Sequence, residues 1–266
     1  MAGRLTGKVA VVTGGTQGLG EAIALECARA GAAGVVICGR NAGHGEKVRA
    51  ALAAAGTRAL FVSADLASLS DCDKVIAAAD KVFSRIDVLV NAAGLTDRGD
   101  IFDTTPERFA ELFDVNVRAP FFLTQGAVRI MRREKIAGCV INIQSMSAHG
   151  GQPFLTAYSM SKGALATMTK NVANALLAHR IRILGLNIGW MDTPGEDRVM
   201  RVYHGAQDGW LDKAVKSRPF GRLVDPKEVA RFCAYLASDE AGLITGANID
   251  FDQTVAGTSE PPIPVG

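Results

Sequence analysis

The chain has 266 residues, of which 48% are apolar, 21% are charged and 6% are aromatic, and its formal net charge is +2. This composition excludes a disordered, a collagen-like and a coiled-coil chain, and a chain of this length can bury a core without disulfide or metal staples. Because there is no basic run, the sequence predicts no nucleic-acid partner. The longest stretch without charged residues, 136–161, contains many Ser, Gln, Gly and His residues, so we expect no membrane span.

The cysteines are scattered along the chain without a CxxC pair: they are Cys27, Cys38, Cys72, Cys139 and Cys233. An odd, dispersed set argues against a disulfide framework and against a zinc site, and we expect all of them to be small buried residues. The sequence predicts no metal site. The N-terminus lacks the apolar segment of a signal peptide and runs directly into a strand. We therefore expect a cytoplasmic chain.

Short β-branched runs alternate along the chain with longer, Ala-rich segments of helical period. The predicted strands are Val9–Thr13, Val35–Cys38, Ala59–Ser63, Val88–Asn91, Val140–Ile143, Ile181–Asn187 and Asn248–Phe251. The predicted helices are Gly18–Ala30, Gly43–Ala55, Ser70–Ser84, Pro106–Arg132, Thr156–His179 and Pro226–Leu236. The strands are nearly continuous apolar runs, which is typical of a sheet covered on both faces.

Strands that alternate with helices imply right-handed crossovers and a parallel sheet. We predict an α/β fold: a single Rossmann-type domain over residues 1–266, with a doubly wound parallel sheet of about seven strands and helices on both faces. An eight-stranded barrel has a similar length, but only seven strands are convincing, and a glycine-rich turn follows the first of them. One segment, 191–219, is polar and aromatic and has no clear period.

The glycine-rich turn reads Thr13-Gly-Gly-Thr-Gln-Gly-Leu-Gly20 and opens the first predicted helix. Glycine lets the backbone approach a pyrophosphate, and the helix N-terminus supplies free N–H groups and a positive dipole to that anion. The spacing G-x-x-x-G-x-G differs from the commoner G-x-G-x-x-G, and an ordinary glycine turn is the alternative. Its place directly after the first strand favours a dinucleotide site. The cofactor-binding residues predicted here are Gly14, Thr16, Gln17, Gly18, Leu19 and Gly20.

The end of the second strand is expected to meet the adenosine ribose, where a carboxylate binds a 2′-hydroxyl and an arginine accommodates a 2′-phosphate. This chain reads Cys38-Gly-Arg-Asn41, without a carboxylate. Arg40, with Asn41 beside it, therefore favours NADP(H). A solvated surface charge is the alternative for Arg40, and NAD(H) is the alternative cofactor.

Tyr158 and Lys162 lie four residues apart in a predicted helix, so their side chains share one face. A phenol with a pKa of about 10 is a poor base at neutral pH. A lysine ammonium about 4 Å away is worth roughly 4 kcal/mol at an effective dielectric constant of about 20, or about three pKa units. We therefore expect Lys162 to bring the pKa of Tyr158 into the working range.

Ser145 lies near the carboxyl end of the fifth predicted strand, thirteen residues before Tyr158. Ligands bind outside the carboxyl ends of such strands, so the Ser145 hydroxyl is expected to face the same crevice. Ser147 competes for this role, and a plain turn serine is the alternative for Ser145. Asn116 lies inside the fourth predicted helix, where a surface polar residue is the simpler interpretation.

Several motifs occur together in a consistent order and spacing: TGGTQGLG, LVNAAG at Leu89–Gly94, Asn116, INIQS with Ser145, and YSMSK from Tyr158 to Lys162. Over residues 7–251, nearly the whole chain, the sequence resembles the short-chain dehydrogenase/reductase family. The resemblance implies that Tyr158 is the general acid/base and that Lys162 binds the nicotinamide ribose and lowers the pKa of Tyr158. It also implies that Ser145 hydrogen-bonds the reacting oxygen and that Asn116 holds a water in a proton relay.

The resemblance implies further residues that hold the cofactor. They are Asp65 and Leu66 at the adenine, Asn91, Ala92 and Gly94 at the floor of the site, Tyr158 and Lys162 at the ribose, and Ile188, Gly189 and Thr193 around the carboxamide. The implied chemistry is hydride transfer between the nicotinamide and a substrate carbon, while Tyr158 exchanges a proton with the substrate oxygen. A homo-oligomer, either a tetramer or a dimer, is also implied.

The sequence departs from the family pattern at three places. The usual Pro-Gly after the sixth strand is Ile188-Gly189, and the usual Asn-Asn-Ala-Gly is Asn91-Ala-Ala-Gly94. The last strand runs Asp250-Phe-Asp-Gln253, where many members have Asp-Gly-Gly. None of these changes alters the four catalytic candidates, but the first is expected to change the nicotinamide loop slightly.

Residues 191–219 are expected to cover the substrate, and their polar and aromatic side chains favour a sugar, a polyol or another polar hydroxy or keto compound. The substrate-binding candidates are Ser147, His149, Trp190, Arg198, Tyr203 and His204, for which a solvent-facing position is the alternative. The predicted enzyme is thus an NAD(P)-dependent alcohol dehydrogenase or carbonyl reductase acting on a small molecule. The alternatives are a cofactor-binding sensor or scaffold without turnover, a reductase of less polar 3-oxo substrates, and a methyltransferase, in which the Tyr158–Lys162 pair has no role.

Overall fold

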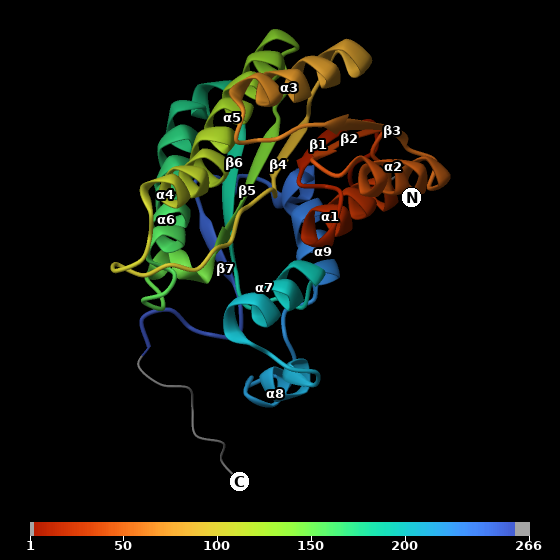
Figure 1. Ribbon diagram of the computed structural model, residues 1–266. Helices are drawn as coiled ribbons and strands as arrows, with labels where there is room; N and C mark the ends of the chain where they lie inside the picture. Colours follow the sequence, from red (N-terminus) through yellow and green to blue (C-terminus); the bar gives the residue numbers. More distant parts are fainter. Residues whose placement is uncertain (1–2, 259–266) are drawn as a thin grey trace.

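The computed structural model describes residues 3–258, and its centre is a seven-stranded sheet in which every pairing is parallel (Figure 1). The strands, in chain order, are β1 (Val9–Thr13), β2 (Gly34–Gly39), β3 (Arg58–Ser63), β4 (Val88–Asn91), β5 (Cys139–Ser145), β6 (Arg182–Ile188) and β7 (Asn248–Phe251). Their order across the sheet is β3-β2-β1-β4-β5-β6-β7. The predicted fold class is confirmed.

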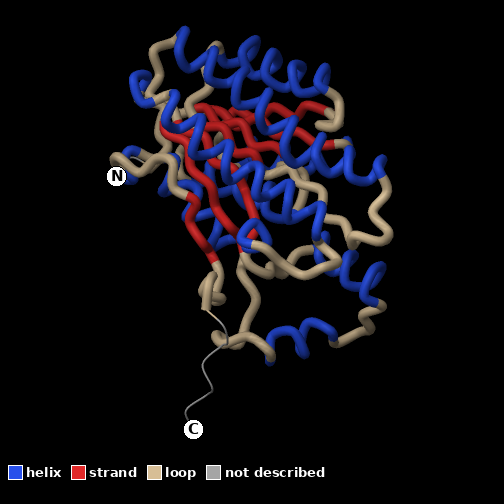
Figure 2. Tube along the Cα trace, turned by 90° about the vertical axis from the view of Figure 1, so that its left-hand side faces the viewer, coloured by secondary structure: helices blue, strands red, loops and turns tan. Residues whose placement is uncertain are grey.

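Helices cover both faces of the sheet, so that the strands lie between two helical layers (Figure 2). One layer contains α1 (Gly18–Arg29), α2 (Ala42–Ala54) and α9 (Pro226–Ala237), and Ile23, Leu52 and Val229 are buried beneath it. The other contains α3 (Leu69–Phe83), α5 (Ala119–Arg133) and α6 (Thr156–Ala175). Because each strand is apolar on both faces, one apolar core lies on either side of the sheet.

The strand order reverses between β1 and β4, which are neighbours although two strands and three helices separate them along the chain. The chain leaves β1 toward β2 and β3, and after β4 it builds the sheet in the opposite direction. Such a reversal opens a crevice outside the carboxyl ends of the central strands. Of the candidate catalytic residues, Ser145 ends a strand on this side of the sheet, and Tyr158 and Lys162 lie on α6.

The single helix predicted for Pro106–Arg132 is wrong. The structure has α4 (Pro106–Phe113), a π-helical turn at Asp114–Arg118, and then α5. Pro120, at the start of α5, has no N–H and cannot donate to the carbonyl of Asn116. π-turns arise where the regular hydrogen-bond ladder is interrupted.

The segment 191–219, predicted without regular structure, contains α7 (Pro194–His204) and α8 (Trp210–Lys216) below the carboxyl ends of the strands (Figure 1). The Thr193 hydroxyl caps α7, and Gly205, in the left-handed region, ends it. Trp210 and Leu223 form a small apolar cluster of their own with Trp190 and Met200. The helices lack a long apolar stripe because they pack against this cluster and not against the sheet. Within residues 3–258 no helix combines the length and the apolar character needed to cross a membrane.

Candidate active site

A cleft of about 990 Å³ runs along the carboxyl ends of the strands. It brings together most of the predicted residues, which are separated by up to 190 positions in the sequence. The predicted residues that line it are Gly14, Thr16, Gln17, Gly18, Leu19, Gly20, Arg40, Asp65, Leu66, Ala92, Gly94, Ser145, Ser147, His149, Tyr158, Lys162, Ile188, Gly189, Trp190, Thr193 and His204. Asn41, Asn91, Asn116, Arg198 and Tyr203 do not line it.

The glycine turn is fixed by backbone sterics. Gly14 and Gly18 have φ angles of 65° and 56°, a region that side chains disfavour. A Cβ on Gly20 would lie 2.3 Å from the Gly14 carbonyl oxygen, so the turn closes only with glycine there. Gln17, the N-cap of α1, makes no side-chain hydrogen bond to the helix. The first N–H groups of α1 therefore face the cleft without a side-chain cap, as an anion site requires.

Arg40 is exposed and follows β2 directly. It lines the same part of the cleft as the glycine turn. A guanidinium in this position fits the 2′-phosphate of a dinucleotide. Asn41, in contrast, caps α2: its Oδ1 accepts the N–H of His44 at 2.9 Å. Its role in the structure is thus to begin a helix.

Tyr158 is in the first turn of α6, and Ser145 is the last residue of β5. The Ser145 Oγ accepts the N–H of Ser147 at 3.2 Å, which holds the serine hydroxyl at the end of the strand. Burial raises the pKa of Tyr158, and hydrogen bonds with Ser145 and Thr96 oppose this rise without cancelling it. Burial therefore keeps the Tyr158 phenol protonated at neutral pH, and Ser145 and Thr96 line the same cleft beside it.

Lys162 is almost completely buried one helical turn beyond Tyr158. Its Nζ donates to the Ile143 carbonyl at 2.9 Å and lies 5.8 Å from the centre of the Tyr158 ring. Burial lowers the pKa of Lys162 to about 8. Burial is the largest influence on the pKa of Tyr158, and the Lys162 ammonium faces a carbonyl, so the lowering of this pKa by Lys162 stays a prediction.

Asn116 lies in the π-helical turn and is buried. Its Oδ1 accepts the Leu95 N–H at 2.8 Å, and its Nδ2 donates to the Leu95 carbonyl at 2.9 Å and to the Ser161 Oγ at 3.0 Å. Gly94 lies directly against Asn116 and Lys162, since a Cβ there would come within 3.6 Å and 3.4 Å of their polar atoms. Asn116 thus fixes the loop after β4 against α6.

Asn91, predicted at the floor of the cofactor site, is buried beneath that floor. Its Nδ2 donates to the Asn142 Oδ1 at 2.8 Å and to the Thr124 Oγ1 at 3.2 Å. These bonds join β4 to β5 and α5. Asn91 supports the strand ends from below, and Ala92 and Gly94 form the surface of the cleft.

His149 lines the cleft, and two strands hold its ring. Its Nε2 lies 2.8 Å from the Asp250 Oδ1 and 3.1 Å from the Asn187 Nδ2, and Asn187 also donates to Asp250 at 2.7 Å. Burial raises the pKa of Asp250, but its hydrogen bonds to His149 and Asn187 outweigh this and leave the pKa below its ordinary value. His149 is therefore a fixed polar group of the cleft.

Sequence reasoning did not name several side chains that line the cleft, among them Thr96, Arg98, Phe154, Glu196, Met200 and Arg218. Residues 254–258 line it as well. Thr96 and Arg98 follow the carboxyl end of β4, and this position in the sequence could have identified them as cleft residues. The others lie in the segment 191–219, which was expected to cover the substrate, and in the loop before α6, and no local sequence pattern singles them out.

A family model described as enoyl-(acyl carrier protein) reductase matches residues 14–255, which include the glycine turn, Ser145 and the Tyr158–Lys162 pair. The chain belongs to the short-chain dehydrogenase/reductase family. This short-chain dehydrogenase/reductase is an oxidoreductase by family. The family that the sequence motifs predicted is thus confirmed.

Relatives with informative names match this short-chain dehydrogenase/reductase over nearly its whole length. An NADP-dependent (R)-specific alcohol dehydrogenase of Lentilactobacillus kefiri is 36% identical, over 95% of this chain and 98% of the relative. A galactitol 2-dehydrogenase of Agrobacterium fabrum is 31% identical, over 94% and 97%. The solved L-sorbose reductase of Gluconobacter frateurii, complexed with NADPH and L-sorbose, has a TM-score of 0.89 and 28% identity, over 97% of this chain and 100% of that chain.

Proposed function

We propose that the chain interconverts a secondary alcohol and a ketone with NADP(H), and that Tyr158 is the general acid/base. The observation that carries this proposal is one cleft lined by the glycine turn, Ser145, Tyr158 and Lys162. A sensor or scaffold protein would have no use for a phenol that lines the cofactor cleft together with a serine hydroxyl and a buried lysine. The named relatives, an alcohol dehydrogenase and a galactitol 2-dehydrogenase, support the same reaction class.

The residues of the cleft divide the work of the reaction. The protonated Tyr158 donates to the carbonyl oxygen of a ketone in reduction and takes the proton back in oxidation. The Ser145 hydroxyl fixes the same oxygen and stabilises its developing negative charge. Lys162 binds the ribose and stabilises the phenolate that forms after proton transfer. Bound NADP(H) supplies or accepts the hydride.

We further propose that the cofactor lies against the glycine turn with its 2′-phosphate at Arg40. The Lentilactobacillus kefiri relative is named NADP-dependent, and the Gluconobacter frateurii structure is a complex with NADPH. Asp65 and Leu66 bind the adenine, and Ile188, Gly189 and Thr193 bind the carboxamide end. NAD(H) is the alternative cofactor, because Arg40 has no second basic residue beside it in the glycine turn, where Gln17 stands.

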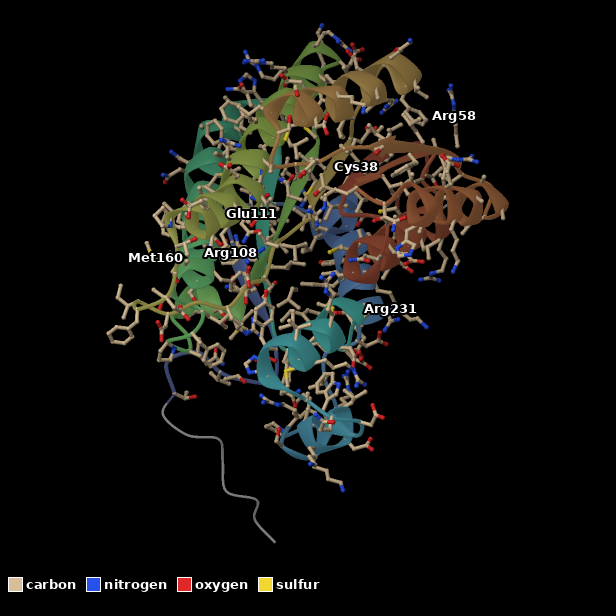
Figure 3. All side chains as sticks on the ribbon, in the orientation of Figure 1. Cys38, Arg58, Arg108, Glu111, Met160 and Arg231 are labelled. Carbon is tan, nitrogen blue, oxygen red and sulfur yellow. The ribbon has the colours of Figure 1, made fainter. Side chains whose placement is uncertain are left out.

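The cofactor proposal is tested by titration of nicotinamide fluorescence with NADPH and NADH. Arg40→Ala is expected to weaken NADPH binding by about 30-fold and to leave NADH binding unchanged, since only the former carries the 2′-phosphate. Arg58→Ala is the matched control, because Arg58 begins β3 at the outer edge of the molecule and stacks on Phe83 (Figure 3). Equal affinity of the wild type for both nucleotides would contradict the assignment.

The substrate we propose is a polar hydroxy or keto compound, such as a sugar or polyol, held beneath residues 191–219. Ser147, His149, Glu196 and His204 supply hydrogen-bonding groups at this end of the cleft. The names of the galactitol 2-dehydrogenase and the L-sorbose reductase support the same class. Less polar 3-oxo compounds are the alternative, because Phe154, Trp190 and Met200 form an apolar wall there.

The reaction is tested by absorbance at 340 nm with panels of keto sugars, polyols and hydrophobic ketones. Tyr158→Phe is expected to reduce turnover about 1,000-fold and to weaken NADPH binding far less, because the variant lacks the hydroxyl that exchanges the proton. Tyr235→Phe is the control, since Tyr235 stacks on Phe232 on α9, outside the cleft. Turnover of ketones alone would reject the polar substrate class. Full activity of the Tyr158 variant would reject the mechanism.

We also propose that the chain forms a homo-oligomer in the cytoplasm. Phe109, Phe121 and Phe122, on α4 and α5, are between 37% and 44% exposed. Large apolar side chains exposed together mark surfaces that bind another protein. The five cysteines are unpaired and buried, which supports a reducing compartment. Light scattering after size-exclusion chromatography distinguishes a dimer or tetramer from a monomer.

A further inference from the structure

Arg98 is the best-fixed cation at the substrate end of the cleft. It lies in the loop between β4 and α4, where the Gly99 N–H donates to the Phe154 carbonyl at 2.9 Å. Its Nε donates to the His204 Nε2 at 3.0 Å, and its guanidinium lies 5.6 Å from the centre of the Phe154 ring. Contacts from two other segments therefore hold the guanidinium in place before any ligand arrives.

This cation has no anionic partner in the part of the chain that the structure describes. Within residues 3–258 no carboxylate lies within 4 Å of the Arg98 guanidinium, and its Nη1 is buried without a hydrogen-bond acceptor. Leaving a charged donor buried and unpaired costs free energy, unless a ligand supplies the acceptor. A carboxylate matches the planar fork of a guanidinium with two parallel hydrogen bonds.

A second arginine, Arg218, also lines the cleft. Arg218 lies 4.9 Å from the centre of the Trp190 ring and lines the cleft, and its buried Nε also lacks an acceptor among the described residues. Arg108, by comparison, is next to Glu111 on α4 and pairs with both Glu111 and Asp97 (Figure 3). Arg98 and Arg218 thus line the cleft with buried donor atoms that no carboxylate of the described residues satisfies.

Glu196 places a negative charge in the same part of the cleft, apart from the Arg98 cation. Its Oε1 accepts the Trp190 Nε1–H at 2.7 Å, so the carboxylate is held near Trp190 and does not neutralise Arg98. Both charges act on the Tyr158 phenol, since Arg98 lowers its pKa and Glu196 raises it. A ligand with a carboxylate at Arg98 and hydroxyl groups toward Glu196 would satisfy both ends, whereas a carboxylate at Glu196 would be repelled.

We propose that the substrate is a hydroxy or oxo acid whose carboxylate binds Arg98 while its reacting carbon lies at Tyr158. This inference deepens the proposed function and rests on it for the reaction. The arrangement discriminates between substrates of equal polarity. A neutral polyol fills the same space but leaves the Arg98 cation unpaired, whereas an acid of the same length pairs it.

Matched substrate pairs test the inference through kcat/KM. The pairs are D-gluconate with D-glucitol, and 3-hydroxybutyrate with its methyl ester. The wild type is expected to prefer at least one acid over its neutral partner by about 100-fold, and Arg98→Gln to remove that preference, because a charged partner is lost. Arg98→Lys is expected to keep part of it, since the charge stays and the fork is lost. Arg231→Gln, on the exposed surface of α9 and outside the cleft (Figure 3), is the control.

Two results would overturn the assignment: a preference of the wild type for the neutral member of both pairs, or an equal loss for acid and neutral substrates in Arg98→Gln. Circular dichroism of that variant verifies that it is folded.

Calorimetry of the same acids, with the wild type and its NADPH complex, needs no turnover and separates the two levels of the proposal. Acid binding that weakens about 100-fold in Arg98→Gln and not in Arg231→Gln supports the carboxylate site even if no substrate is turned over, in which case the proposed reaction is what fails. Absence of acid binding to the wild type and to its NADPH complex overturns the carboxylate site, whatever the reaction.

Discussion

The glycine turn and the segment 191–219 line one cleft and are built in different ways. The turn is closed by contacts within seven residues, such as the close approach of Gly20 to the Gly14 carbonyl. The covering segment is held by side-chain pairs, both within it, as between Trp210 and Asp197, and with residues far away in the sequence. His204 accepts from Arg98, 106 positions away, and a hydrogen bond with Asp97 raises the pKa of Tyr203.

This difference explains which function each end can carry. A turn whose shape follows from backbone sterics presents the same N–H groups in any sequence that keeps its glycines, so it suits a cofactor common to many enzymes. A segment held by side-chain pairs can change its contacts one residue at a time, so it suits the discrimination of substrates. The cleft therefore combines a glycine turn suited to a common cofactor with a covering segment suited to a particular substrate.

The largest effect is expected from a Cβ in the glycine turn. Gly20→Val should weaken NADPH binding about 1,000-fold, or by about 4 kcal/mol, because the new side chain collides with the Gly14 carbonyl and opens the turn. Fluorescence titration measures the affinity. Gly43→Ala is the control: Gly43 lies in the first turn of α2, where a Cβ meets only the Asn41 Oδ1 at 3.5 Å. Unchanged NADPH affinity in Gly20→Val would show that the turn does not bind the cofactor.

The sequence predicted the sheet and the cofactor end well because both depend on short-range rules. All seven strands were found, three of them with exact ends and the others with ends shifted by up to two residues, since buried parallel strands are continuous apolar runs. The extra two residues of β5 matter most, because they make Ser145 the end of the strand. Ser145, Tyr158 and Lys162 were brought together correctly because a strand end and one helix face determine their positions.

The parts that the sequence did not predict depend on tertiary contacts. The π-helical turn at Asp114–Arg118 depends on Pro120 and on the bonds of Asn116 with Leu95, a residue 21 positions earlier. Helices α7 and α8 pack on a cluster around Trp210 that is separate from the main core. The upward pKa shift of Tyr158 depends on its burial, which no spacing of Tyr and Lys reveals.

A smaller effect is expected at Lys162, which is buried in the wall of the cleft. Its pKa falls on folding from 10.5 to about 8, so below about pH 8 the fold must bury an ammonium, at a cost of about 3 kcal/mol. Between these pKa values the unfolded chain binds more protons, so stability rises with pH through this window. Lys162→Met should therefore raise the free energy of unfolding by about 2 kcal/mol near pH 7, after the loss of about 1 kcal/mol from its hydrogen bond to Ile143.

The measurement is urea unfolding of the wild type and the variant at several pH values. The gain in stability should shrink steadily as the pH approaches 10.5, and activity should be lost at every pH. Lys170→Met, an exposed position on the same helix, is the control and should show no such trend. A variant that is less stable than the wild type near neutral pH would show that the Lys162 ammonium stabilises the empty fold.

The smallest effect is expected at the substrate end. In His204→Ala the Arg98 Nε loses its acceptor and the edge contact of His204 with Phe154, at 5.4 Å between ring centres, disappears. Hydrogen exchange in α7 should become about fivefold faster, equivalent to about 1 kcal/mol, while exchange in α1 and the affinity for NADPH stay as they are. If exchange in α1 rises equally, the two ends of the cleft are one cooperative unit. If only α7 responds, side-chain pairs hold the covering segment independently of the glycine turn, and substrate specificity can change without disturbing the cofactor site.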